Sequence, residues 1–242
     1  MKIVAKTDVG MVRESNQDSY TTGELPNGVA WAVVCDGMGG AAGGNVASST
    51  AVKVIAEQIT SSFRPGMSAN SIKNMMVSAI NAANISVYDI SCSNSELYGM
   101  GTTVVCAIVM EHIAYIAHAG DSRAYIVSHG DLTQLTRDHS VVQELVEHGK
   151  ITALEAKRHL NKNIITRAVG VSREILVDFS EQEMKDGDVL LLCTDGLTNF
   201  VESDEMCDLT KDDMFYEFAE RLVDRANKNG GGDNVTVVAV TY

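Results

Sequence analysis

Three aspartates, each next to a glycine, stand at the ends of strongly apolar segments: Asp36, Asp195 and Asp233. The segments are short and rich in β-branched residues, which predicts buried strands with a carboxylate at one end of each. Glycine beside the carboxylate lets the chain turn sharply and lets another group approach the main chain. Carboxylates and main-chain carbonyls, with no cysteine or histidine in the pattern, suit Mg²⁺ or Mn²⁺ better than Zn²⁺. The sequence therefore predicts a divalent metal site built from distant parts of the chain.

For any single one of these aspartates the alternative is an ordinary turn, because Asp-Gly pairs are common turn formers. Three of them at the ends of strongly apolar strands favour a shared site over three separate turns. Asp18 and Asp121 also lie in polar segments beside predicted strands, and each alone is more typical of a turn. Arg13 is either a solvated surface charge or a fork that binds an anionic group beside the metals.

Positioning these residues requires several strands and helices, which hydrophobic periodicity indicates along the chain. Strands are predicted at residues 2–7, 19–22, 29–35, 102–110, 113–119, 122–128, 132–136, 175–179, 188–193 and 235–240. Apolar residues at helical spacing predict long helices at 45–63, 70–91 and 212–227. The four runs between residues 102 and 136 are separated by tight turns, one of them Gly120-Asp121, so we expect an antiparallel meander there.

The number and order of these elements predict an α+β fold. They lack the strict alternation of strand and helix that a doubly wound parallel sheet needs. We therefore expect a central antiparallel β-sandwich flanked on both sides by helices, in four αββα layers. Residues 139–168 are polar, rich in histidine and contain two short helical patterns, so we expect a flap over the site. No proline-rich linker divides the chain, and residues 1–242 are expected to form a single domain.

The charge, hydropathy and cysteine content of the chain indicate which partners and which cellular compartment to expect. The formal net charge of −13 and the pI near 4.8 argue against a nucleic-acid binder that works by phosphate neutralisation. No apolar run approaches the ~20 residues of a membrane span, and the N-terminal residues do not resemble a signal peptide. Five cysteines without a C-x-x-C pair are typical of a reducing compartment, and Cys35, Cys106 and Cys193 fit small core residues. We expect a monomeric cytoplasmic protein with no nucleic-acid or membrane partner.

Seven short motifs occur in one order along the chain, and the set resembles the metal-dependent protein phosphatases of the PPM family, type 2C, especially their compact bacterial members. The motifs are Arg13-x-x-Asn16-x-Asp18, Asp36-Gly37-Met38-Gly39-Gly40, Gly101-Thr102-Thr103, Gly120-Asp121-Ser122-Arg123, Thr136-x-Asp138-His139, Thr194-Asp195-Gly196-Leu197 and Gly232-Asp233-Asn234-Val235-Thr236. They span nearly the whole chain, and the ordered set is highly specific. The family fold, a β-sandwich flanked by helices, agrees with the layers expected from periodicity.

The resemblance implies a role for each matching carboxylate. Asp36 would bridge two metal ions, and the Gly37 carbonyl would bind one of them. Asp195 and Asp233 would complete the first metal, and Asp18 would act through a water molecule. The implied cofactor is two to three divalent ions, Mn²⁺ or Mg²⁺.

Two further positions complete the implied site. Asp121 matches the residue that holds a third, weaker metal in bacterial members of the family. Arg13 matches the arginine that receives the substrate phosphate. Residues 139–168 occupy the place of the family's flap, which influences substrate choice.

The implied activity is hydrolysis of phosphoserine and phosphothreonine on proteins. Paired divalent ions can lower the pKa of a water molecule until hydroxide forms near neutral pH and attacks phosphorus in line. Arg13 and the metals would hold the phosphate oxygens. The implied partners are phosphorylated proteins and a cognate bacterial Ser/Thr protein kinase, whose signalling such an enzyme opposes.

One position departs from many eukaryotic members of the family. Met38 stands where they carry a histidine that has been assigned as general acid for the leaving group. Methionine donates no useful proton, so the donor is open between a metal-bound water and His139. Bacterial relatives share the methionine, and activity is therefore still expected.

Three other functions fit the sequence less well. A cysteine-dependent phosphatase needs an arginine six residues after the cysteine, and none of the five cysteines has one. A dinucleotide-binding loop is suggested by Gly37-x-Gly39-x-x-Ala42 before a helix, but Asp36 would place negative charge against a pyrophosphate. A catalytically inactive, phosphoprotein-binding relative would have lost a metal carboxylate, and all three strand-end aspartates are present.

Overall fold

The computed structural model, which describes residues 1–210 and 215–242, contains two antiparallel sheets packed face to face. The first sheet comprises β1 (Lys2–Asp8), β11 (Val235–Thr241), β10 (Val189–Cys193), β7 (Arg123–Ser128) and β8 (Asp131–Gln134), in that spatial order. The second comprises β2 (Asp18–Leu25), β3 (Val29–Met38), β5 (Val104–Met110), β6 (Ile113–Ala119) and β9 (Asp178–Glu183), with β4 (Gly101–Thr102) paired to β3.

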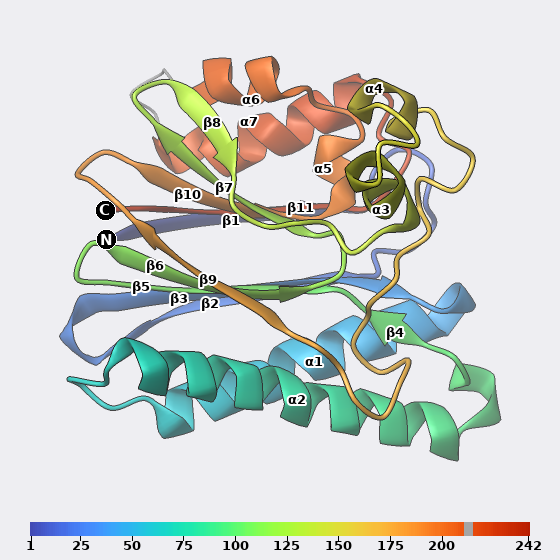
Figure 1. Ribbon diagram of the computed structural model, residues 1–242, viewed down its shortest axis with the longest axis horizontal. Helices are drawn as coiled ribbons and strands as arrows, with labels where there is room; N and C mark the ends of the chain where they lie inside the picture. Colours follow the sequence, from blue (N-terminus) through green and yellow to red (C-terminus); the bar gives the residue numbers. More distant parts are fainter. Residues whose placement is uncertain (211–214) are drawn as a thin grey trace.

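Helices cover the outer faces of both sheets (Figure 1). The described helices are α1 (Gly40–Ser62), α2 (Ala69–Ser93), α3 (Val141–Glu147), α4 (Ala153–Ala156), α5 (Asp195–Thr198), α6 (Ser203–Thr210) and α7 (Phe215–Lys228). Figure 1 shows α1 and α2 across the second sheet, and α6 and α7 over the first. These are the four αββα layers that the sequence predicted.

Three hydrophobic cores hold these layers together. β10 contributes side chains to two of them, which explains why its sequence is apolar throughout. Leu190 and Leu192 face the other sheet in the central core, whereas Leu191 between them packs on the opposite face with Leu222 of α7. Successive side chains of a strand point to opposite faces, so a strand covered on both sides reads as one continuous apolar run. The third core lies between the second sheet and α1 with α2.

Strand β3 continues past the apolar run that predicted it. The run ends at Cys35, but β4 pairs with Gly37 and Met38, which keeps the chain extended for three more residues. Asp36 therefore lies inside a strand rather than after its tip. Its direct partner across the β2–β3 ladder is Asp18, so two carboxylates face each other on neighbouring strands.

The expected antiparallel meander between residues 102 and 136 is wrong. β5 pairs with β6 in the second sheet, whereas β7 pairs with β8 in the first. Gly120-Asp121 is therefore a crossover between the two sheets, not a tight turn within one. Periodicity cannot distinguish the two cases, because each requires a polar break between apolar strands. The crossover leaves Asp121 at the end of the sandwich where β3 meets β4.

Several element boundaries also differ from the prediction. α1 begins at Gly40 rather than near residue 45, and the short helices α5 and α6 were not predicted. The strand expected at 175–179 forms as β9 further along, because Ile175 and Val177 contribute apolar packing without pairing. The expected start of the last helix, residue 212, lies outside the described residues. The two short helical patterns of the expected flap form α3 and α4.

Two expectations from composition can be compared with the structure. Cys35, Cys106 and Cys193 are buried and carry free thiols, as expected for small core residues. In the described part of the chain, no helix combines the length and apolar character that crossing a bilayer requires.

Candidate metal centre

The predicted site residues meet at one end of the sandwich, in a cavity of about 840 Å³. Figure 1 shows α3, α4 and β4 at this end and the chain termini at the other. Six of the seven predicted site residues line the cavity: Arg13, Asp36, Gly37, Asp121, Asp195 and Asp233. Met38 lines it as well, together with Asn163 and Ile165 of the expected flap. Residues far apart in the sequence thus form a common wall.

The backbone of Asp36 is held by two threonines that the sequence analysis quoted but did not interpret. The Asp36 N–H donates to Thr103 Oγ1 at 2.9 Å. In return, the Thr103 N–H and the Thr102 hydroxyl both donate to the Asp36 carbonyl, at 2.9 and 2.8 Å. Two adjacent threonines after a glycine, as in Gly101-Thr102-Thr103, are the sequence signal that could have indicated these hydrogen bonds.

Two glycines are required where chain segments come together at the cavity. A Cβ on Gly37 would lie 2.1 Å from the carbonyl oxygen of Gly44 in α1. A Cβ on Gly196 would lie 1.9 Å from the carbonyl oxygen of Asn234. Glycine is thus needed for α1 to approach Asp36 and for the Asp195 turn to approach the Asp233 loop.

Asp195 is the first residue of α5 and lies near Asp36 across the cavity. Its Oδ2 accepts a hydrogen bond from the Asn199 amide at 3.0 Å, one helical turn further on. The Asp36 carboxylate is close enough to influence the pKa of Asp195, so carboxylates carried by β3 and α5 lie near each other. Asn199 was not predicted as a site residue.

Asn234 fixes the loop that carries Arg13, a role the sequence analysis missed. Its side-chain amide donates to the carbonyls of Val9 and Ser15 at 2.9 and 3.0 Å, one on each side of the arginine. Its Oδ1 accepts the Gln17 N–H at 2.8 Å. Arg13 reaches the cavity from this clamped loop.

Arg13 forms an ion pair with one of the candidate metal ligands. Its Nη2 lies 2.8 Å from Asp233 Oδ2, and about half of the arginine side chain is exposed. A guanidinium at this position can exchange a carboxylate partner for a phosphate oxygen without leaving the cavity wall.

Asp18 lies behind Asp36 and does not line the cavity. Its Oδ2 accepts hydrogen bonds from the hydroxyls of Thr194 and Thr236, at 2.9 and 2.7 Å. Its Oδ1 is buried and has no hydrogen-bond partner among the residues that the structure describes. A buried carboxylate oxygen without a hydrogen-bond partner destabilises the folded protein, and a bound water molecule or cation can supply the missing interaction.

The carboxylates raise one another's pKa. Burial, followed by neighbouring carboxylates, raises the pKa of Asp18 and of Asp121 to about 7. The same causes raise the pKa of Asp36 well above its usual range, and burial with the Asp233 charge raises that of Asp195. An all-oxygen donor set with this excess of negative charge fits Mg²⁺ or Mn²⁺.

These shifts predict that the metal-free protein loses stability as pH rises. A folded-state pKa above the unfolded value gives stability that is full below the unfolded pKa and lost as pH rises through about 7. In EDTA, we expect the free energy of unfolding to fall by a few kcal/mol between about pH 5 and pH 8. Urea denaturation at a series of pH values measures this.

The Asp18→Asn variant is the control for the pH dependence. Asparagine keeps an oxygen for the two threonine hydroxyls but does not titrate, so the fall should be smaller. Saturating Mn²⁺ should reduce the fall in the unmodified protein as well. Stability that is constant or rises over this range in EDTA would contradict the electrostatic description of the site.

His139 does not occupy the position expected of a proton donor. Its side chain is 1% exposed, and it is absent from the residues that line the cavity. Both ring nitrogens already have partners, Gly120 and Asp178. The structure therefore argues against His139 as the group that protonates the leaving group.

The dinucleotide-binding alternative also fails on the topology. A dinucleotide fold places its glycine-rich turn after a strand of a parallel sheet. Here β3 is antiparallel to both of its neighbours, β2 and β5. The glycines after Asp36 serve the approach of α1 and β4 instead.

Comparison with known proteins decides the family. The family model for protein phosphatase 2C matches residues 12–236, nearly the whole chain. The chain belongs to the protein phosphatase 2C family. This confirms the resemblance drawn from the seven motifs, and the matched range contains every residue assigned to the cavity.

Individual members of the protein phosphatase 2C family agree in sequence and structure. The serine/threonine phosphatase stp of Listeria monocytogenes is 38% identical over 236 residues, which cover 97% of this chain and 93% of the relative. The S. agalactiae serine/threonine phosphatase superimposes with a TM-score of 0.93 at 32% identity, covering 100% of this chain and 99% of that one. The catalytic domain of PstP in complex with two manganese ions gives a TM-score of 0.85 at 33% identity, covering 98% and 96%.

Proposed function

We propose that this protein is a metal-dependent protein serine/threonine phosphatase that hydrolyses phosphoserine and phosphothreonine on proteins. The observation that carries the proposal is the convergence of Arg13 with the carboxylates of Asp36, Asp121, Asp195 and Asp233 in one cavity. Metal-assisted phosphoryl transfer uses oxygen ligands that hold the ions and a guanidinium that stabilises the phosphate charge, and both kinds of group line this cavity. The names of the relatives support the same reaction.

The metal ligands in this proposal are Asp36, Gly37, Asp195 and Asp233 for two divalent ions, Mn²⁺ or Mg²⁺, and Asp121 for a third. When bound, such ions supply Lewis acidity and lower the pKa of a coordinated water. The hydrogen bonds that the Asp36 N–H and carbonyl make with Thr103 and Thr102 fix the backbone of Asp36. Asp18, shielded behind it, acts through water.

Arg13 binds the substrate phosphate in this proposal. In the structure its guanidinium is paired with Asp233, so it is already held at the cavity wall. A planar guanidinium presents two parallel N–H groups to phosphate oxygens and stabilises the charge that they carry. Asn234 holds the Arg13 loop in place, because its side-chain amide binds the carbonyls of Val9 and Ser15 on either side of Arg13.

The wider features of the proposal follow the family. Residues 1–242 act as one catalytic domain, with residues 139–168 as a flap whose Asn163 and Ile165 line the cavity. The substrates are phosphorylated proteins, and the regulatory partner is a cognate bacterial Ser/Thr protein kinase. Action in the cytoplasm, as a monomer, is part of the proposal, and the free thiols, three of them buried in the cores, fit such a reducing compartment.

Hydrolysis of two phosphopeptides tests the reaction class. We expect phosphate release from a phosphothreonine peptide with Mn²⁺ or Mg²⁺, loss of release in EDTA, and much slower release from a phosphotyrosine peptide. Calorimetric titration with Mn²⁺ and with the phosphothreonine peptide should accompany the assay. Peptide binding without release under any metal condition would instead identify an inactive phosphoprotein-binding relative.

A further inference from the structure

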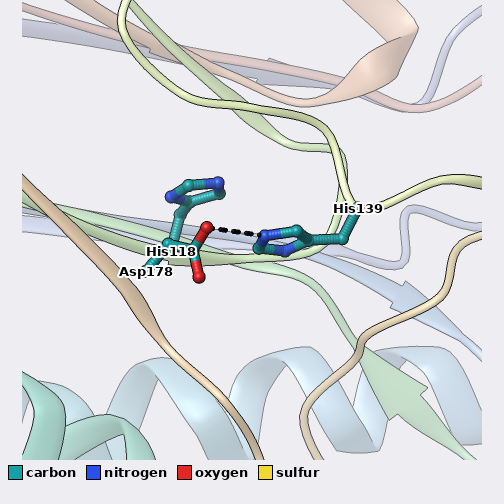
Figure 2. Close-up of side chains that lie close together, drawn as sticks. All are labelled: His118, His139 and Asp178. Atoms are coloured by element: carbon teal, nitrogen blue, oxygen red, sulfur yellow. Dashed lines mark hydrogen bonds and ion pairs between the residues drawn. The ribbon is translucent and has the colours of Figure 1, made fainter. Parts of the chain in front are cut away.

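Two histidines and an aspartate form a cluster beside the cavity rather than in it. The ligand atoms of His118, His139 and Asp178 all lie within 4.8 Å of one another (Figure 2). The two rings are stacked, with centroids 4.8 Å apart and planes 4° apart. Figure 2 shows the His139 ring directed at the Asp178 carboxylate, which belongs to β9. Nothing in the proposed reaction uses this cluster directly.

The hydrogen bonds of His139 determine its tautomer and argue against a metal ion in the cluster. Its Nδ1 lies 3.1 Å from the Gly120 N–H, which can only donate, so Nδ1 carries the lone pair. The ring proton is therefore on Nε2, which donates to Asp178 Oδ2 at 3.1 Å. An ion bound at Nε2 would move that proton to Nδ1, against the Gly120 N–H. A hydrogen-bond relay fits these contacts, whereas a metal site does not.

The first end of this relay is the crossover that carries Asp121. The backbone N–H of His139 donates to the Gly120 carbonyl at 2.9 Å, so ring and backbone together bind both sides of one residue. Gly120 has φ +115°, and a Cβ there would lie 2.7 Å from the Thr103 side chain. The crossover is therefore confined between His139 and Thr103, directly before the Asp121 carboxylate.

The second end of the relay is the flap. Asp178 Oδ1 accepts from Arg167 at 2.6 Å, and the Thr166 N–H donates to the His139 carbonyl at 2.8 Å. Arg167 and Thr166 lie at the carboxyl-terminal end of the expected flap, and His139 lies at its start. One buried imidazole thus joins both ends of the flap to the crossover.

We propose that His139 is a positioning residue: its Nδ1 sets the place of the Asp121 carboxylate, and its Nε2–H ties that place to the flap through Asp178. This deepens the proposed function and rests on it, because Asp121 matters here as a metal ligand. A change in the flap that moves Arg167 or Asp178 would then alter the affinity of the site that contains Asp121.

Two substitutions at this one position separate the two hydrogen bonds. In His139→Asn the amide oxygen can take the place of Nδ1 and still accept the Gly120 N–H, but the side chain cannot reach Asp178. In His139→Gln the amide reaches the place of Nε2 and can donate to Asp178, but nothing accepts the Gly120 N–H. Each variant loses one buried hydrogen bond, so a purely structural role would affect both alike.

We expect the two variants to differ in metal binding. Calorimetric titration with Mn²⁺ should show the weakest site reduced on the order of 10-fold in His139→Gln and nearly unchanged in His139→Asn. Amide hydrogen exchange at Gly120 should be faster in His139→Gln alone. Asp121→Ala provides the reference in which that site is lost. Equal Mn²⁺ titrations for the Asn and Gln variants would overturn the proposal.

A measurement on the unmodified protein keeps the proposal testable if a variant does not fold. Nitrogen-15 shifts of the His139 ring should report a protonated Nε2 and an unprotonated Nδ1, and the opposite tautomer would overturn the relay. The outcomes remain separable from those of the proposed function. An unmodified protein that binds no Mn²⁺ and releases no phosphate refutes the phosphatase, whereas an active protein with equal variants refutes only the relay.

Discussion

Replacing Asp36 with asparagine is expected to lower kcat for a phosphothreonine peptide by more than about 100-fold, beyond the loss typical of residues that only support a metal ligand. Asp36 lines the cavity, opposite Asp18 on the neighbouring strand, and is close enough to Asp195 to influence the pKa of that carboxylate. An amide has one oxygen and no charge, so it would hold divalent cations more weakly than the carboxylate that we propose as their ligand. Steady-state assays at saturating Mn²⁺ measure the change.

The same substitution should leave the metal-free fold intact or more stable. Burial and neighbouring carboxylates raise the pKa of Asp36, so its ionised form is unfavourable in the folded protein without metal. Thermal unfolding in EDTA should therefore show no fall in Tm. A variant with near-normal kcat at saturating Mn²⁺ would remove Asp36 from the proposed centre.

Asp188→Asn is the matched control for this experiment. Asp188 is buried as well, but it lies at the other end of β10, where its Oδ2 accepts the Lys185 N–H. Asparagine retains an oxygen for that bond. We expect kcat to stay within about twofold of the unmodified protein, because Asp188 does not line the cavity and its hydrogen bond to Lys185 is retained.

Replacing Arg13 with alanine is expected to raise KM for the phosphothreonine peptide about 10- to 100-fold, with Mn²⁺ binding retained. A hydrogen bond to a charged group contributes about 1.5–3 kcal/mol, which corresponds to that range. The pair with Asp233 is partly exposed to solvent, so its loss should cost little stability. Inhibition by inorganic phosphate should weaken in parallel, because product and substrate share the phosphate group.

Arg13→Lys tests whether charge alone suffices. Lysine retains the positive charge but offers one point of contact instead of a planar pair of donors. We expect a KM between those of the unmodified protein and Arg13→Ala. An unchanged KM in Arg13→Ala would assign the phosphate contact to another residue and leave the arginine as a partner of Asp233.

The sequence predicted the carboxylates and the layers because both follow from local patterns. An apolar run beside an aspartate and a glycine can be recognised from the sequence alone. The same holds for β10, which is apolar at every position because both of its faces are buried. The ends of strands were less predictable. β3 runs on through Asp36 because β4, more than sixty residues later, pairs with it, and no local signal carries that information.

The errors concern pairings between distant segments. Gly120-Asp121 reads as a turn by residue type, yet the strands on either side of it belong to different sheets. His139 was a candidate proton donor because histidine titrates near neutral pH. Its place is set instead by Gly120 and Asp178, whose proximity depends on the crossover and on β9. Long-range contacts of this kind must be seen in three dimensions.

The pairing of β1 with β11 has a consequence for how the protein is made. All seven residues of Lys2–Asp8 pair with residues near the end of the described chain, and the Arg13 loop is clamped by Asn234. During synthesis β1 must therefore wait until β11 has been made before its ladder can form. Asn234, which clamps the Arg13 loop, directly precedes β11, so we expect a nascent chain that lacks this segment to be inactive.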